Sequence, residues 1–149
     1  MSSNKKNEVV KALFVLDVIG KPPEHLTKTL GEIIKKISEE RGVKVVNKKI
    51  NEPILMKDQK DFYTTFAEIE VEVETISHLA MLMFKYPPAH IEVISPELVE
   101  LTNNGWSDIL SEIARRLHQY DEIAKVLQVQ NIKMQRKLKE LGVDVEKKE

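Results

Sequence analysis

The chain has 149 residues, no cysteine, and 23 basic against 24 acidic side chains. The lack of cysteine excludes disulfides, thiolate metal sites and cysteine nucleophiles, and the balanced charge gives no overall attraction to nucleic acid. No apolar run approaches the roughly 20 residues of a membrane helix, and the polar first residues lack the apolar core of a signal peptide. We therefore expect a cytoplasmic protein without a membrane segment.

The first half of the chain alternates between strand and helix patterns. Residues 9–19 are apolar on both faces, which is typical of a strand in the middle of a sheet that is covered on both sides. Apolar residues then recur at helical spacing from Leu26 to Ile37, and the helix is expected to end near Gly42. Residues 43–50 are rich in lysine, which indicates an edge strand, and residues 51–60 are expected to form a loop.

Residues 61–74 give the clearest strand pattern, with Phe66 and four glutamates alternating against a largely apolar face. Thr75 is a suitable N-cap for a short apolar helix, and residues 89–94 form a last strand. The resulting order is the βαββαβ order of a ferredoxin-like α+β sandwich. Right-handed crossovers place the strands at 9–19 and 61–74 in the centre, with both helices on one face. We assign this domain to residues 9–104, after a flexible tail at 1–8.

A long helix is predicted after a hinge-like break at residues 102–105. It occupies residues 105–142 and is followed by a flexible tail at 143–149. Its apolar residues are spaced alternately by four and three, as in a coiled coil, and Asn131 is the only polar residue in that run. The a positions are Leu110, Leu117, Ala124, Asn131 and Leu138, and the d positions are Trp106, Ile113, Tyr120, Leu127, Met134 and Leu141.

This heptad pattern implies a partner. The first half is expected to pack on the protein's own core, because Ile109 and Ile123 widen its apolar face. The distal half extends beyond a compact domain, and leaving its four large apolar residues in water would forgo about 6–12 kcal/mol. We therefore predict a homodimer with parallel or antiparallel helices, and another protein with a similar helix is the alternative partner. The predicted contacts are Leu127, Asn131, Met134, Leu138 and Leu141.

No group of residues forms a motif for catalysis, metal binding or cofactor binding. The four histidines lack metal-ligand spacing, and pairing with lysines on the neighbouring strand accounts for the glutamates. Asp17 is the best single catalytic candidate, but solvation at a strand end is the simpler interpretation. We predict no enzyme activity, no cofactor and no metal.

Basic residues on the long helix form a second candidate surface. A solvated helix face is the simpler interpretation, and contact with phosphate or a partner is the alternative, which would suit an RNA- or ribosome-associated factor. The candidate contacts are Arg115, Arg116, Lys125, Lys133, Arg136 and Lys137.

Two resemblances add expectations. The segment Asp17-Val18-Ile19-Gly20 through Leu26 resembles the first strand-to-helix turn of ACT-type regulatory domains, which implies a small effector at Gly20, although the usual Pro-Gly pair is missing. The whole layout resembles uncharacterised archaeal ferredoxin-like proteins. The leading hypothesis is a non-enzymatic interaction protein that homodimerises through its C-terminal helix and presents binding surfaces to a macromolecular partner. An RNA- or ribosome-associated factor is the first alternative, and an ACT-like regulatory domain is the second.

Overall fold

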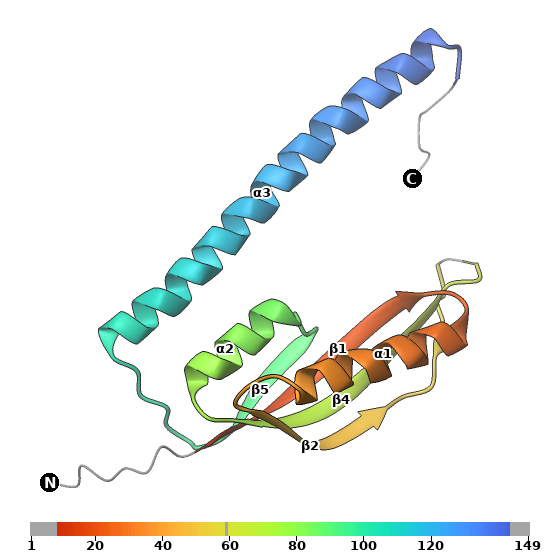
Figure 1. Cartoon of the computed structure of the whole chain (residues 1–149). Coiled ribbons are helices and arrows are strands. Elements are labelled where there is room, and N and C mark those ends of the chain that lie inside the picture. Colours follow the sequence, from red (N-terminus) through yellow and green to blue (C-terminus); the bar gives the residue numbers. More distant parts are fainter. Residues whose placement is uncertain (1–8, 59, 144–149) are drawn as a thin grey trace, which may run out of the picture. The chain divides into compact units, whose positions relative to one another are not determined.

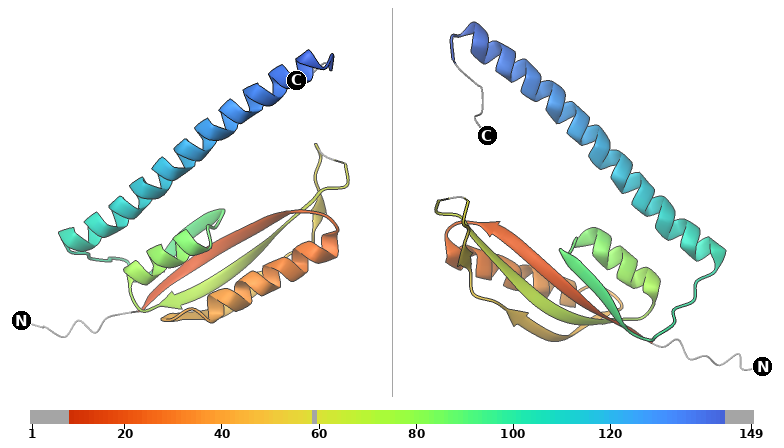
Figure 2. Two further views of the ribbon diagram at one scale, coloured as in Figure 1. Left: turned by 45° about the horizontal axis from the view of Figure 1, so that its top comes forward. Right: turned by 180° about the vertical axis from the view of Figure 1, so that it is seen from behind.

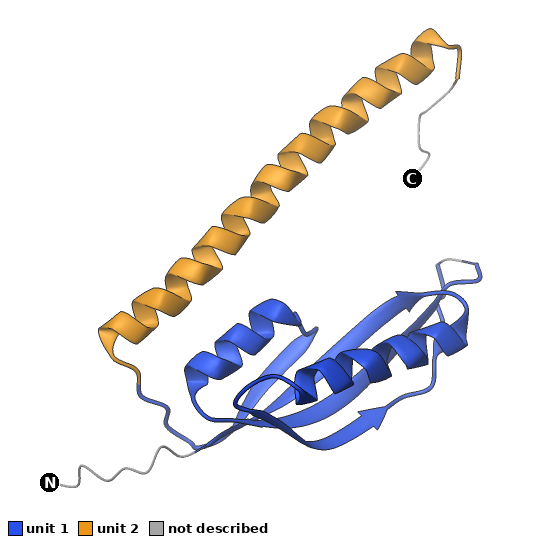
Figure 3. Ribbon diagram, viewed as in Figure 1, with its two compact units in different colours: residues 1–100 blue, residues 101–149 orange. Residues whose placement is uncertain are grey.

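The sheet strands and helices follow one another along the chain in the order that the sequence predicts (Figure 1). The computed structural model describes residues 9–58 and 60–143, so the predicted tail at 1–8 and all but Val143 of the tail at 143–149 lie outside the described residues. The elements are β1 (Val10–Gly20), α1 (Pro23–Ser38), β2 (Val43–Ile50), β3 (Ile54–Leu55), β4 (Tyr63–Val73), α2 (Ile76–Lys85), β5 (His90–Ser95) and α3 (Asn103–Glu140). The chain divides into two compact units, residues 1–100 and residues 101–149 (Figure 3).

The first unit is an antiparallel sheet in the order β2-β4-β1-β5, with β3 added beside β4. β1 and β4 pair along their whole length, from Val10 opposite Val73 to Gly20 opposite Tyr63. This order, together with the helices after β1 and β4, confirms the predicted ferredoxin-like α+β fold. β2 is an edge strand, as its lysines indicate.

One face of the sheet carries the hydrophobic core. Every second residue of β1 and β4 points to this face, because side chains alternate along a strand. Both helices contribute to the same core, so they cover the same face, as predicted (Figure 2). The buried core residues are Val10, Ala12, Phe14, Leu16, Leu30, Ile34, Ile37, Ala67, Ile69, Val71, Val73, Leu79 and Leu82.

The opposite face of the sheet carries no helix of this unit, although β1 was expected to be covered on both sides. β1 is central, but the helices of this unit pack on one face only. On the other face Leu13 and Val15 are half-buried, and the neighbouring Phe66 is 37% exposed. Cross-strand pairing explains the glutamates there, because the register places Lys44 opposite Glu72.

Lysines occupy two further positions along this ladder. The register places Lys49 opposite Glu68, and Lys11 Nζ lies 3.4 Å from Glu70 Oε2. The pattern of glutamate on β4 and lysine on its neighbours is therefore that of a solvated charge ladder.

Three predicted boundaries were wrong. α1 ends at Ser38, before the expected position, and Gly42 lies instead in the turn to β2 with a φ of +75°. The expected loop at 51–60 contains the short strand β3, which pairs with the start of β4. The expected break at 102–105 is a helix start, because the Gly105 N–H donates to Thr102 Oγ1 at 3.0 Å.

Polar contacts fix the helix termini of the first unit. Thr75 is the N-cap of α2, as predicted, and its Oγ1 accepts from the His78 N–H. The Tyr86 hydroxyl donates to Glu40 Oε1 at 2.7 Å, and the Lys85 ammonium pairs with the same oxygen. The pKa of the Glu40 carboxyl is lowered by its hydrogen bonds with Lys85 and Tyr86. This contact joins the ends of α1 and α2 beside the sheet.

The described part of the second unit contains one helix, α3, with 38 residues. At 1.5 Å per residue it is roughly 57 Å long. The helix ends in a Schellman motif, because Gly142 has a φ of +77° and the Val143 N–H donates to the Leu138 carbonyl at 2.9 Å. Within residues 9–58 and 60–143, no helix is both long enough and apolar enough to cross a membrane.

Candidate interaction site

The heptad stripe of α3 exposes large apolar side chains along the helix. No described residue of α3 is buried, and Leu127, Met134 and Leu141 expose 58%, 64% and 72% of their surface. The other two predicted contacts are also exposed, Leu138 at 37% and Asn131 on the same stripe. All five predicted contact residues therefore lie together along one side of the distal helix. The expected packing of the first half on the protein's own core stays a prediction.

Three further apolar residues of α3 were missed by the sequence reasoning. Val126, Val129 and Ile132 are 55%, 52% and 49% exposed, although they lie outside the a and d positions. The signal was present in the sequence, because residues 126–132 contain no charged side chain.

The upper part of the predicted basic stripe is paired with carboxylates of the same helix. Arg116 Nε donates to Glu112 Oε1 at 2.9 Å, and Arg115 Nε donates to Glu112 Oε2 at 3.1 Å. These hydrogen bonds from Arg115 and Arg116 lower the pKa of Glu112 to about 2. Lys125 Nζ lies 2.8 Å from Asp121 Oδ2. Arg115, Arg116 and Lys125 are thus bound to carboxylates of their own helix, which favours the solvated-face interpretation for these three.

The distal basic residues differ from the upper ones. Lys133, Arg136, Lys137 and Lys139 form a distal basic cluster in the last turns of α3, where cations also suit the helix dipole. In the described part of the chain, none of these four has a carboxylate within 4 Å. This cluster is the part of the predicted stripe that is available to phosphate or to an acidic partner.

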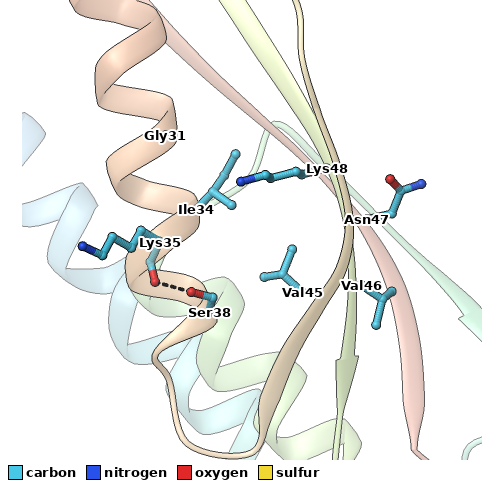
Figure 4. Close-up of a pocket in the computed structure, with 8 residues that line it drawn as sticks. All are labelled: Gly31, Ile34, Lys35, Ser38, Val45, Val46, Asn47 and Lys48. Atoms are coloured by element: carbon cyan, nitrogen blue, oxygen red, sulfur yellow. Dashed lines mark hydrogen bonds between the residues drawn. The ribbon is translucent and has the colours of Figure 1, made fainter.

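An open groove lies between α1 and the edge strand β2 (Figure 4). Its volume is about 640 Å³, and it is lined by Gly31, Ile34, Lys35, Ser38, Val45, Val46, Asn47 and Lys48. Val45 and the Lys48 ammonium point into it, whereas Val46 and Asn47 point away. Of the two lysines in the lining only Lys48 points into the groove, so there is no set of converging polar groups such as a selective small-molecule site requires.

The ACT-like turn and the acidic candidate show no binding arrangement. A Cβ on Gly20 would lie 3.2 Å from Leu26 Cδ2, so the buried side chain of Leu26 fills the space beside that glycine. Asp17 is exposed and lies opposite Phe66 on the open sheet face. Within the described residues, no three His, Asp or Glu side chains are grouped to hold a metal ion.

The histidines are placed separately. His118 Nε2 lies 3.0 Å from Glu122 Oε1 on α3, and His78 Nδ1 lies 2.8 Å from the Thr75 hydroxyl at the start of α2. His25 and His90 are exposed on different elements. Each histidine therefore has a local role on its own element or faces solvent.

Comparison with known proteins assigns the chain to a family. The chain belongs to the MJ0538 family, whose model matches residues 11–147. The family is named after a Methanocaldococcus protein, which agrees with the expected resemblance to an archaeal family. The match includes β1 to β5 and all of α3, so both units are part of the family's sequence. No curated protein and no solved structure matches the chain.

Proposed function

We propose that this member of the MJ0538 family is a non-enzymatic interaction protein that forms a homodimer through the heptad stripe of α3. The dimer would present two copies of the sheet unit to a macromolecular partner in the cytoplasm. The observation that carries the proposal is the exposure of Leu127, Met134, Leu138 and Leu141 along one side of a 38-residue helix. A strip of this kind on a protein surface marks an association site.

The composition of the stripe supports a second copy as the partner. Knobs-into-holes packing needs apolar residues at a and d, and α3 supplies them over five heptads with Asn131 as the one polar residue. A single polar asparagine at an a position can fix the register and favour a dimer, at a cost in stability. The seam on one copy thus complements the seam on another.

Substitution of the seam tests the proposal. The variant with Leu127→Gln and Leu138→Gln should be monomeric by light scattering, while the full-length wild type has a mass above that of one chain. The matched control carries His118→Gln and Glu140→Gln on the outward face, and it should keep the wild-type mass. A wild type that has the mass of one chain at micromolar concentration would contradict the proposal.

A second candidate function is RNA or ribosome binding by the distal basic cluster. Its support is that Lys133, Arg136, Lys137 and Lys139 have no carboxylate partner among the described residues. Binding through phosphates would weaken steeply with salt, with a slope that decreases as lysines are removed. The measurement is the affinity for a single-stranded RNA over a salt series, for the wild type and for the variant with Lys133→Gln, Arg136→Gln and Lys139→Gln. Unchanged binding in that variant argues against this function.

A further inference from the structure

β2 lies at one end of the sheet, and its outer backbone edge is open. The sheet order gives β2 a single neighbour, β4, among the described residues. The N–H and C=O groups of β2 that point away from β4 therefore form an unpaired row, along which another strand can pair. The same edge borders the groove beside α1, whose floor includes Ile34 and Val45 (Figure 4). A strand added to β2 would thus place its side chains on the helix side into this groove.

The side chains of β2 present lysine on both faces of this edge. Lys44 and Lys49 lie on the open face of the sheet, because the register places them opposite glutamates of β4. Lys48 lies on the helix side and points into the groove. Among the described residues, no carboxylate lies within 4 Å of these three lysines. None of the residues that line the groove is acidic, so the outer side of β2 is apolar and basic.

We propose that β2 and its groove bind an extended acidic segment of another protein, which joins the sheet as a strand beside β2. Side chains of the added strand would alternate between apolar residues in the groove and acidic residues beside Lys44 and Lys49. Backbone hydrogen bonds supply the affinity in this mode of binding, so converging polar side chains are not required. The proposal rests on the proposed function, in which the sheet unit binds a macromolecular partner, and it names the surface and the chemistry of that partner.

The charge pattern of the sheet selects an acidic strand. Glutamates of β4 lie opposite lysines of β2 on the open face, and cross-strand pairs of opposite charge are favourable. Acidic residues beside Lys44 and Lys49 would continue this alternation of sign across the sheet. A second copy of β2 would instead bring lysines together, and edge lysines are known to oppose such self-association. The lysines of β2 therefore disfavour a second β2 and favour an acidic partner.

Gly31 keeps the groove open on the helix side. It lines the groove, and a Cβ at this position would meet open space. A leucine side chain there would occupy the groove, and leucine is also a much better helix former than glycine. Substitution at Gly31 can therefore block the groove while it stabilises α1, which separates a loss of binding from a loss of folding.

Titration of the full chain with a synthetic peptide tests the proposal. The probe is an acetylated fluorescent peptide of alternating valine and glutamate that matches the eight-residue length of β2. It should bind saturably, and hydrogen exchange of β2 amides should slow as the outer N–H groups become paired. Two control peptides should bind at least about tenfold more weakly. One has the same residues in two separate blocks, and the other has every backbone nitrogen methylated.

The groove variant Gly31→Leu should bind the probe at least about tenfold more weakly than the wild type, because its side chain occupies the groove. Its matched control is Gly31→Ala, which should bind like the wild type because a methyl group is too small to fill the groove. Urea unfolding should show that neither variant is less stable than the wild type. Wild-type affinity in Gly31→Leu would overturn the proposal.

A second pair of variants tests the charge of the edge. The lysine variant should bind the probe about tenfold more weakly, and it carries Lys44→Gln, Lys48→Gln and Lys49→Gln. Its control should bind like the wild type, and it removes the same charge at exposed positions outside β2, with Lys36→Gln, Lys57→Gln and Lys125→Gln. Equal affinities in the two variants would overturn the selection of an acidic strand.

The remaining arms separate this proposal from others. Absence of binding by the wild type at about 1 mM peptide would overturn it. Displacement of the probe by a single-stranded RNA, together with undiminished binding of the methylated peptide, would replace the added strand by a phosphate contact. The variant with Leu127→Gln and Leu138→Gln should bind the probe like the wild type, because it changes only α3. A wild type that is dimeric by mass but does not bind the probe would therefore overturn the added strand and leave the seam pair intact.

Discussion

Single glycines in the first unit have opposite effects on stability because their backbones differ. Gly42 has a φ of +75°, and a Cβ there would lie 2.8 Å from His78 Cδ2. Gly31 lies inside α1, and no atom is within 4 Å of its Cβ position. The sequence placed the end of α1 near Gly42, but the helix ends at Ser38 because the chain makes a further turn before β2.

The variant Gly42→Ala should therefore be destabilised, by about 1–2 kcal/mol for the left-handed backbone and further by the contact with His78. The variant Gly31→Ala should be stabilised by roughly 0.5–1 kcal/mol, because alanine loses less entropy in a helix. Urea unfolding of the two variants measures both changes. Equal effects at the two positions would contradict this assignment of the turn.

The sequence predicted the heptad pattern of α3 but not its ionic contacts. The alternation of four and three gave the seam, because the apolar period depends on the helix alone. Proximity in sequence placed Arg115 and Arg116 in a basic stripe, yet both are bound by Glu112, three and four residues earlier. Side chains three and four residues apart meet on a helix surface. Glu112 therefore pairs with both arginines, which a count of basic residues along the chain does not reveal.

The Glu112 contact predicts a pH effect on α3. The folded-state pKa of Glu112 is lowered from 4.5 to about 2 by the hydrogen bonds from Arg115 and Arg116. A lowered pKa stabilises the helix above the unfolded value, and this stabilisation is lost as pH falls from about 4.5 to about 2. The wild type should therefore melt at a higher temperature than Glu112→Gln at neutral pH, and the difference should shrink across that window. A difference that is independent of pH would contradict the contact.

The charges of α3 also predict the orientation of the seam pair. The first part, Asn103–Glu122, has four acidic and two basic residues, a net charge of −2 with histidine neutral. The second part, residues 123–140, has five basic and one acidic, a net charge of +4. An antiparallel pair places opposite charges side by side and opposes the helix dipoles, whereas a parallel pair places the two basic parts together.

The cysteine-free chain allows this orientation to be measured. A spin label on a Glu140→Cys variant should give a distance of roughly 40–50 Å between labels in an antiparallel pair. A parallel pair would place the labels within about 20 Å of each other, because paired helices lie 8–10 Å apart. The shorter distance would contradict the charge argument.

For the whole molecule, the fold was more predictable than its surfaces. Strand alternation and helix spacing identified the ferredoxin-like order, because each pattern is local and the crossover rule then limits the topology. The helices of the first unit cover only one face of β1, and this could not be predicted in the same way. Leu13 and Val15 have the composition of a doubly covered strand, and the sequence does not reveal which element, if any, lies against their face.

The location of the core predicts how the molecule responds to truncation. Among the residues that the structure describes, the fifteen buried hydrophobic ones lie between Val10 and Phe84, and none lies in α3. A chain that ends at Glu100 should therefore retain the near-ultraviolet spectrum and the cooperative unfolding of a packed domain, because its buried core is complete. It should also be monomeric, since it lacks the seam.

The two readouts of this truncation separate the roles of the two units. A folded monomer would assign folding to the sheet unit and association to α3. Loss of cooperative unfolding would mean that the sheet unit depends on α3 for stability, and the half-buried face of Leu13 and Val15 would then be the first place to search for that dependence. A folded dimer would place an association surface on the sheet unit, with the edge strand β2 and its lysines as the first candidate for substitution.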